Sequence, residues 1–374
     1  MLRSSRFLYG VSLAVAAAAT MAPPGAVVHA QGCVVARGAG ITPVHAPPGL
    51  DSESAAGRMQ TSVAYRYLHS DRHYVGSEEQ KERKREGSQV INDSHFVDIS
   101  IDYAFNDRTS LTLAVPYAKH DRSSVVRDSN RNILRRFHTQ NSGFADLRLT
   151  SNTWLMDPKM HADGNILLGL GVDIPTGNDD AEDYFDTYNA TTGQIEKVRR
   201  TVDQSVQLGD GGWGVLVDVF AYRRLTPALT VFFNGFYAAT PEQTNGVPTF
   251  RGNPFEAEMS IADTYMARAG FDYLVWPLHN MTITLDARVE GVPVHDLVGG
   301  SDGFRRPGYS MAIEPGVSAT VGSYELSLSA PISAYRNRER SVADRRWTEA
   351  TGVFRHGDAA FADFLVLLNV AKAF

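Results

Sequence analysis

Hydrophobic and polar residues alternate with a period of two along most of the chain after residue 58. The clearest segment is 95–105, where Val97, Ile99 and Ile101 share one parity and Asp98 and Asp102 share the other. In a soluble sandwich the apolar face of such a strand would turn to a core. In a barrel within lipid it would turn outward, and the polar face would turn to the lumen.

Twelve segments follow this rule with varying clarity. They are 59–67, 95–105, 111–117, 146–155, 166–174, 215–222, 229–237, 265–273, 281–289, 309–317, 324–332 and 364–374. The links after the second, sixth, eighth and tenth segments are short and turn-like, at 106–108, 226–228, 277–280 and 321–323. The link after the fourth is somewhat longer. The links after the odd-numbered segments are long and polar, and include 78–86, 121–136, 175–210, 242–259, 295–308 and 336–358.

Alternating short and long links indicate periplasmic turns on one side of a membrane and outside loops on the other. Unpaired backbone groups in hydrocarbon would cost several kcal/mol each, so the first and last strands must pair. Aromatic residues near strand ends fit the interfacial girdles of such proteins, and they are Tyr65, Tyr67, Tyr103, Tyr117, Tyr273 and Phe374. We therefore predict an all-β fold, a single closed antiparallel transmembrane β-barrel of about 12 strands. A large secreted sandwich or propeller is the alternative, but it explains neither the C-terminal strand nor the loop asymmetry.

The two ends of the chain point to export. Arg3 and Arg6 precede an apolar stretch at 7–21, and small residues end at Ala30, which predicts a signal peptide over 1–30. A membrane anchor, or a lipoprotein modified at Cys33, is an alternative. Residues 31–57 are rich in proline and glycine and form either a plug or a periplasmic tail, ahead of the barrel at 58–374. The final strand ends on Phe374, which resembles the aromatic that the barrel assembly machinery reads in outer-membrane barrels.

Composition narrows the possible classes. The chain has 36 basic and 42 acidic residues, and removal of residues 1–30 takes away two arginines and no acids, which leaves 34 − 42 = −8. Nothing here indicates a nucleic-acid binder. The single cysteine excludes an intramolecular disulfide framework. No apolar run after residue 30 approaches the roughly 20 residues of a spanning helix.

Charged residues occupy the inward parity of the predicted strands. The acids are Asp98, Asp102, Asp146, Asp173, Asp218, Asp272, Asp286, Glu290, Glu314 and Glu325, and the bases are Arg66, Arg148, Arg268 and Arg288. Charges that faced lipid would be penalised, so this shared parity supports the register. The excess of acids predicts a lumen that favours cations or neutral solutes over anions. Alternatively, these acids pair with the arginines and hold a polar plug, and paired charges can also define a constriction.

One inward patch is apolar and contains Phe220, Tyr222, Phe232 and Phe236. It would serve as a path for an aromatic or amphipathic ligand, or it would simply fill space. Eight strands leave an interior filled by side chains, and sixteen to eighteen leave an aqueous channel. Twelve strands therefore predict a narrow, selective passage.

Other patterns could indicate a metal-binding or catalytic site. His69 and His73 share one face of a strand, but four residues span ~13 Å and cannot clamp one metal ion. His138, Ser142 and Asp146 suggest the triad of an outer-membrane lipid hydrolase, but parity turns Asp146 into the lumen while the other two lie in or beside a loop. We therefore predict no catalytic residue, no metal and no cofactor.

Loop charges offer two further candidate sites. The acidic run 178–183 lacks the spacing of a known calcium loop and is expected to be solvated. Arginine pairs recur in the predicted outside loops and would meet lipopolysaccharide phosphates or water, at 135–136, 199–200, 305–306 and 345–346.

With the strands placed, the chain resembles a family of exported bacterial barrels described as outer-membrane transporters and grouped with the phenol-degradation meta-pathway proteins. The resemblance covers most of the chain after residue 30, and the segments that carry it are 71–73, 107–116, 175–177, 209–214, 300–309 and 356–363. It implies a barrel in the bacterial outer membrane. It supplies no ligand-binding motif to carry over.

We therefore predict an outer-membrane channel or porin-like transporter of a Gram-negative bacterium, for passive passage of small solutes, including hydrophobic or aromatic ones. Its expected partners are outer-membrane lipid, lipopolysaccharide, the barrel assembly machinery and a small-molecule solute. A plugged structural barrel that anchors a partner protein is the main alternative, and a lipid hydrolase is a further one.

Overall fold

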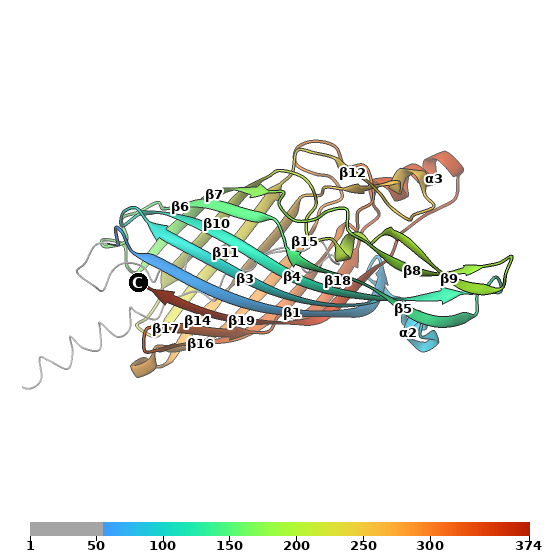
Figure 1. The fold of residues 1–374 in the computed structure, drawn as a ribbon. Helices are drawn as coiled ribbons and strands as arrows, with labels where there is room; N and C mark the ends of the chain where they lie inside the picture. The colour runs from blue at the N-terminus through green and yellow to red at the C-terminus, as the bar shows by residue number, and fades with distance from the viewer. Residues whose placement is uncertain (1–54) are drawn as a thin grey trace, which may run out of the picture.

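The computed structural model describes residues 55–374. The predicted signal peptide at 1–30, Cys33 and nearly all of segment 31–57 lie outside the described residues. The described chain forms one barrel of tilted strands, with the C-terminus at one end and the longer loops at the other (Figure 1).

Ten positions in the barrel wall are each occupied by one continuous strand. These strands are β1 (Met59–Val75), β3 (Ile91–Ala104), β4 (Thr109–Arg127), β7 (Gly164–Ile174), β10 (Gly214–Arg224), β11 (Leu229–Ala239), β14 (Thr264–Trp276), β15 (Met281–Val292), β16 (Gly308–Val321) and β19 (Ala359–Ala373). The other two positions are occupied by pairs of collinear strands, β5 (Ile133–Phe144) with β6 (Leu147–Trp154), and β17 (Tyr324–Ser329) with β18 (Ile332–Arg338).

The first and last strands close the barrel. β1 pairs antiparallel with β19, so that Thr61 lies opposite Lys372 and Val63 opposite Val370. All other neighbours in the wall are also antiparallel and consecutive along the chain. The prediction of a single closed antiparallel barrel of twelve strands is confirmed, because no edge is left within the wall.

The strand predicted at 146–155 is found as β6, but the prediction of one continuous strand at 324–332 is wrong, because that range is divided between β17 and β18. Pro331 has no backbone N–H to donate, and the ladder from β17 to β18 breaks beside it. The break between β5 and β6 falls at Ala145 and Asp146, where the Asp146 carboxylate accepts hydrogen bonds from the backbone N–H groups of Gly177 and Asp210. The Asp146 side chain is thus tied to loop backbone, while the Ala145 N–H still donates to the Pro116 carbonyl of β4.

Short turns join strands at the end of the barrel that carries the C-terminus (Figure 1). The turn between β14 and β15 contains η3 (Pro277–His279) and ends with Asn280 in the left-handed region, at φ 47°. Gly322, at φ 62°, makes the corresponding reversal between β16 and β17. These conformations favour asparagine and glycine, which is why these links read as turns in the sequence.

The long links carry more structure than predicted. They contain β2 (Glu78–Glu79), α2 (Lys81–Glu86), β8 (Glu182–Asn189), β9 (Gln194–Thr201), η1 (Gln204–Val206), β12 (Thr244–Pro248), η2 (Pro254–Glu256), β13 (Glu258–Ser260) and α3 (Val342–Thr351). β4 and β5 also extend through most of the expected loop at 121–136 and pair with each other as a hairpin. Neither α2 nor α3, the two α-helices of the described residues, has the length and apolar character that a membrane-crossing helix requires.

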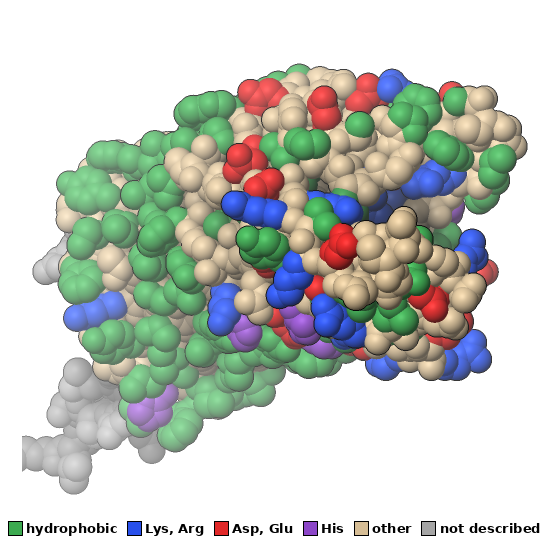
Figure 2. Space-filling view, turned by 45° about the vertical axis from the view of Figure 1, so that its right-hand side comes forward, with side chains coloured by type: hydrophobic (Ala, Val, Ile, Leu, Met, Phe, Trp, Pro, Cys, Tyr) green, Lys and Arg blue, Asp and Glu red, His purple; other side chains and the backbone are tan. Residues whose placement is uncertain are grey.

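The wall is apolar outside and polar inside. Val63, Leu170 and Ile313 on the outer face are each about half exposed, at 48%, 57% and 48%, whereas inward Asp98 and Asn234 are 1% and 0% exposed. Figure 2 shows apolar side chains spread over the wall and charged side chains gathered toward the loop end. This arrangement inverts that of a soluble protein and is the one expected of a barrel in hydrocarbon.

Candidate functional site

The charged residues predicted for the lumen lie on the inner parity of the strands. Ten of them are at least nine-tenths buried, namely Arg66, Asp98, Asp102, Arg148, Asp218, Arg268, Asp286, Arg288, Glu290 and Glu314. Asp146, Asp173 and Asp272 are partly buried. Each alternates with lipid-facing apolar neighbours, because successive side chains of a strand point to opposite faces.

Five charged side chains on β14, β15 and β16 form a connected ion-pair network. Arg288 lies 2.7 Å from Glu290 Oε2 and 3.3 Å from Glu314 Oε2. Arg268 lies 3.4 Å from Glu314 Oε1 and 3.9 Å from Asp286 Oδ2. Glu314 therefore receives two guanidinium groups at once. Breaking a buried pair of this kind is strongly destabilising, because it leaves an uncompensated charge.

The other two predicted bases, Arg66 and Arg148, lie across the lumen from this network. Arg148 on β6 pairs with Asp173 on β7 at 2.7 Å. The Arg66 guanidinium lies 3.8 Å above the ring centroid of Phe96. Much of the expected negative bias is thus compensated locally by arginine.

Two acids nearer the short-turn end are held by hydroxyl groups. Asp102 accepts hydrogen bonds from Ser110 Oγ and Thr112 Oγ1, at 3.0 and 2.6 Å. Asp272 accepts one from Thr284 Oγ1 at 2.6 Å. A hydroxyl donor stabilises a carboxylate without cancelling its charge, so any residual negative potential concentrates at this end of the lumen.

The apolar patch separates into two clusters. Phe220 and Tyr222 stack with ring centroids 6.0 Å apart, and Trp154 packs edge-on to both, at 6.4 and 6.0 Å. Phe232 and Leu167 complete this first cluster. Trp154 and Leu167 were not assigned to the patch from the sequence, although their inward parity on β6 and β7, the two strands that follow β10 in the sheet order, was a usable signal.

Phe236, the fourth predicted patch residue, belongs to a second cluster. It packs there with Leu216, Ala238 and Met266. The apolar surface of the lumen is therefore not one continuous patch, and its two parts have different neighbours.

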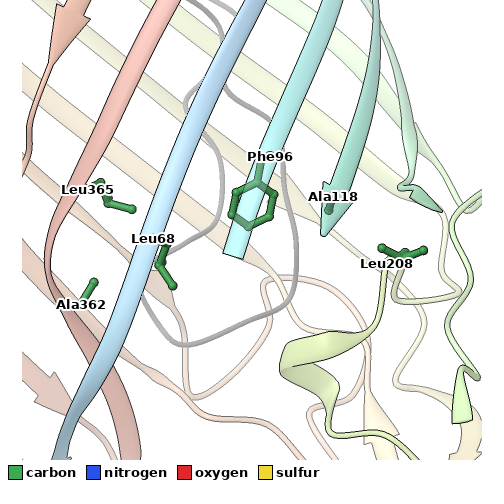
Figure 3. Packing of buried hydrophobic residues seen from close by; sticks show 6 residues of the cluster. All are labelled: Leu68, Phe96, Ala118, Leu208, Ala362 and Leu365. Atoms are coloured by element: carbon green, nitrogen blue, oxygen red, sulfur yellow. The ribbon is translucent and has the colours of Figure 1, made fainter. Parts of the chain in front are cut away.

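Segment 202–208 folds inward from the long loop after β7, which the sequence indicated only as a long, polar link. Val202, Val206 and Leu208 are at most 5% exposed. Figure 3 shows Leu208 reaching from this loop toward Phe96 and Ala118 on the barrel wall. The apolar residues of the segment were the available signal, but its length is too short to show a period.

A buried aspartate anchors this segment to three arginines. Asp203 lies 2.7 Å from Arg306, and 3.4 Å from both Arg122 and Arg251. Burial by itself would raise the pKa of Asp203, but the three guanidinium groups outweigh it and hold that pKa well below its ordinary value. The carboxylate therefore stays ionised and fixes the segment over the loop end of the lumen.

The histidines weighed as catalytic or metal groups have other partners. His69 pairs with Asp93, and His138 Nδ1 lies 2.6 Å from Asp121 Oδ1. His73 Nε2 accepts a hydrogen bond from the Val90 N–H, which leaves Nδ1 to donate to the Asp358 carboxylate. Among residues 55–374, no group of three or more histidine, cysteine, aspartate or glutamate side chains is placed so that it could hold a metal ion.

The charged residues of the loops also form hydrogen bonds and ion pairs with other residues of the chain. In the acidic run, Asp183 accepts from the Gln140 N–H, and Asp179 accepts from the Asn245 amide. Acidic partners are found for arginines of all four pairs, and these ion pairs are Arg135–Asp186, Arg199–Glu182, Arg305–Asp296, Arg306–Asp203 and Arg346–Asp302.

Comparisons with known proteins identify the fold. No protein-family model and no curated protein matches the chain. Among solved structures, the COG4313 outer membrane channel from Pseudomonas putida F1 aligns with 15% identity and a TM-score of 0.55, over 85% of this chain and 96% of that chain.

Two further barrels align with lower TM-scores. The P. putida toluene transporter TodX aligns with 8% identity and a TM-score of 0.42, over 85% of this chain and 90% of that chain. The β-domain of the Bordetella autotransporter BrkA aligns with 10% identity and the same TM-score, over 85% and 100%. The chain has the fold of an outer-membrane β-barrel.

Proposed function

We propose that this outer-membrane barrel is a channel through which small solutes, hydrophobic or aromatic ones among them, cross passively. The observation that carries the proposal is the closed wall around an interior lined by both charged and aromatic side chains. A barrel that only anchored a partner would not require an aromatic cluster within its lumen. The fold likeness to the P. putida F1 channel, with a TM-score of 0.55, supports the same class.

The solute class is argued from the first aromatic cluster. Trp154, Phe220, Tyr222 and Phe232 present ring faces and edges within the lumen, and aromatic solutes gain from offset-stacked or edge-to-face contacts with such rings. The nearby acids would disfavour an anion more than a neutral molecule. Neutral aromatic molecules are therefore the proposed solutes.

Influx of a neutral, fluorescent aromatic probe tests this proposal. The membrane would be an asymmetric bilayer with lipopolysaccharide in the outer leaflet, which slows direct permeation. We expect the wild-type protein to accelerate influx and Phe232→Ala to reduce that acceleration. The adjacent Phe233→Ala is the matched control, because Phe233 is 42% exposed on the lipid face of the same strand. Equal influx with and without the protein would reject the channel.

Residues 31–57 remain a candidate plug or tail, and their deletion separates the channel from the anchoring alternative. If they plug the barrel, their deletion raises probe influx. If the barrel anchors a partner, the deletion leaves influx at the background level, and a stable partner is recovered with the full chain.

We also propose that Phe374 carries the signal for barrel assembly. Its ring is 61% exposed at the end of β19, and its backbone pairs with Met59 at the closure of the barrel. Phe374→Ala is expected to lower the fraction of folded barrel in outer-membrane fractions. Unchanged folded yield would contradict this role.

A further inference from the structure

Segment 202–208 places one carboxylate among three guanidinium groups. Asp203 lies 2.7 Å from Arg306. Arg122 and Arg251 each lie 3.4 Å from the same carboxylate. These arginines belong to β4 and to the loops that follow β11 and β15, so distant parts of the chain converge on a single anion. Guanidinium groups bind carboxylates through directed, charge-assisted hydrogen bonds, and three of them together form a pocket that favours an anion.

The three arginines are also held by groups other than the carboxylate that they share. The guanidinium groups of Arg251 and Arg306 lie over the buried ring of Phe304, at 4.2 and 4.6 Å from its centroid. Arg122 donates a hydrogen bond of 3.0 Å to Asn92 Oδ1 on the neighbouring strand. The pocket therefore has supports that would remain if the carboxylate left it, and such preorganisation favours the binding of a free anion.

The same segment covers apolar surface inside the wall. Leu208 packs with Phe96 and Ala118, and the two valines of the segment are almost fully buried (Figure 3). Gly143 of β5 permits this approach, because a Cβ there would lie 2.8 Å from Leu208 Cδ1. The Arg66 guanidinium lies 3.8 Å above the Phe96 ring, so this surface suits an apolar body that carries negative charge better than one that carries positive charge.

A free molecule with the same two features would compete with the segment. It needs one carboxylate for the three arginines and an apolar body for the surface that Leu208 covers. The segment has the advantage of its tether, which for short flexible links corresponds to an effective concentration in the millimolar range. A free ligand competes when its concentration exceeds that range, or when its body covers more apolar surface than one leucine does.

We propose that segment 202–208 is an internal pseudo-ligand, and that an apolar or aromatic carboxylate displaces Asp203 from the three arginines and releases the segment from the loop end of the lumen. The inference deepens the proposed channel function by naming the class of molecule that opens this end, and its consequence for passage rests on that function. The molecule that opens the barrel is distinct from the neutral solute that crosses it.

Hydrogen–deuterium exchange of the full-length protein in detergent tests the displacement, with benzoate as the probe. At roughly 10–100 mM benzoate, above the effective concentration of the tether, peptides that cover 202–208 should exchange roughly tenfold faster. Benzamide has the same ring without the charge, whereas acetate and inorganic phosphate have charge without the ring. These three compounds should have little effect when ionic strength is held constant, which keeps the screening of exposed ion pairs equal.

Asp203→Asn tests the same pocket from the other side. The variant lacks the internal competitor, so benzoate should raise the temperature of its heat-modifiable gel migration by more than it raises that of wild type. Asp302→Asn is the matched control, because Asp302 pairs with Arg346 and their side chains are 30% and 47% exposed. Benzoate should act on this control as it acts on wild type. The exchange measurement on wild type does not depend on either variant folding.

The exchange results decide between displacement and its alternatives. Faster exchange of 202–208 with benzoate, and with none of the three other compounds, supports the pseudo-ligand. Unchanged exchange overturns it, and so does slower exchange, which would mean that benzoate binds beside Asp203 without displacing it. Equal responses to benzoate, acetate and phosphate would overturn the assigned class of ligand, because the pocket would then bind any anion.

Probe influx separates this inference from the proposed channel. Benzoate should accelerate influx of the neutral aromatic probe through wild type and leave membranes without the protein unchanged. If benzoate releases the segment but the probe never enters, the binding site stands and the channel is wrong. If the probe enters while benzoate changes neither exchange nor influx, the channel stands and the pseudo-ligand is wrong. If the segment is released and an existing influx does not rise, the segment does not close the loop end.

Discussion

Replacing Asp203 by asparagine should free the loop segment 202–208 from the loop end of the lumen. The substitution keeps the side-chain volume but removes the charge that three arginines share. Arg306 and Arg122 are only 11% exposed, and the Asp203 side chain is 1% exposed, so solvent cannot replace the lost partner. The neutral amide would leave these guanidinium groups close together without the carboxylate that they share.

The magnitude follows from the burial of the pair. Removing one partner of a buried ion pair costs about 3–5 kcal/mol. We take the lower end of this energy range, because the segment can open locally. The amides of 202–208 should then exchange with deuterium roughly a hundredfold faster than in wild type. The barrel strands should keep their wild-type exchange, because their ladders do not include the segment.

The assay is hydrogen–deuterium exchange of the protein in detergent, read on peptides that cover 202–208. Asp302→Asn is the control, because Asp302 also pairs with a loop arginine, Arg346, but their side chains are 30% and 47% exposed. Exposed pairs contribute about 0–1 kcal/mol, so its exchange should change little. Unchanged protection of 202–208 in Asp203→Asn would refute the anchoring argument.

The same anchor sets an expectation for pH. The folded-state pKa of Asp203 is depressed, so its stabilising contribution is present above the ordinary aspartate pKa and is lost only as the pH falls through the lower folded value. Wild-type segment 202–208 should therefore remain protected at about pH 5, where an unperturbed aspartate is still mostly ionised. Loss of protection between about pH 7 and 5 would mean that another group controls the segment.

Three further variants test the interior of the barrel. Gly171→Val should destabilise the wall by about 1–3 kcal/mol, because a Cβ at Gly171 would lie 2.5 Å from Thr150 Oγ1, and heat-modifiable gel migration should report unfolding at a lower temperature. Trp154→Ala should cost about 3–5 kcal/mol, because it empties the first aromatic cluster, and should also slow influx of the aromatic probe. Neutralising three lumen acids together should lower the preference for cations in the reversal potential under a salt gradient, and these acids are Asp98, Asp102 and Asp286.

Each of these predictions has a control or a contrary outcome. Gly252→Ala should be tolerated, because a Cβ there meets nothing within 4 Å. Trp276→Ala removes an indole that is 52% exposed near the short-turn end, and should leave probe influx unchanged. A reversal potential that stayed constant in the triple variant would show that the arginine-paired network leaves no usable negative potential.

Ion pairs and apolar clusters both line the inside of the barrel. The ion-pair network of Arg268, Arg288 and Glu314 ties neighbouring strands into a rigid wall. Leu367 on β19 packs against two apolar clusters inside this wall. Solutes can pass without unfolding the barrel only if the wall is rigid and a few of the side chains inside it can move.

Local patterns were enough to determine the wall. Side chains of a strand alternate between two faces. The local pattern around residues such as Val97 and Asp98 therefore predicts which of them faces lipid and which faces the lumen, without reference to distant parts of the chain. Turn residues such as Gly322 mark the reversals for an equally local reason. For this reason the twelve wall positions, the closure and the inward set of charges were all accessible from the sequence.

Only the tertiary structure decided what meets inside the barrel. Parity places Leu367 and Phe236 in the lumen, but whether two inward side chains touch depends on how closure and tilt bring opposite walls together. The inward course of 202–208 depends on Asp203 finding Arg122 and Arg306, which lie about 80 and 100 residues away along the chain. Such contacts between distant residues leave no periodic signal, because each forms only after the barrel has closed.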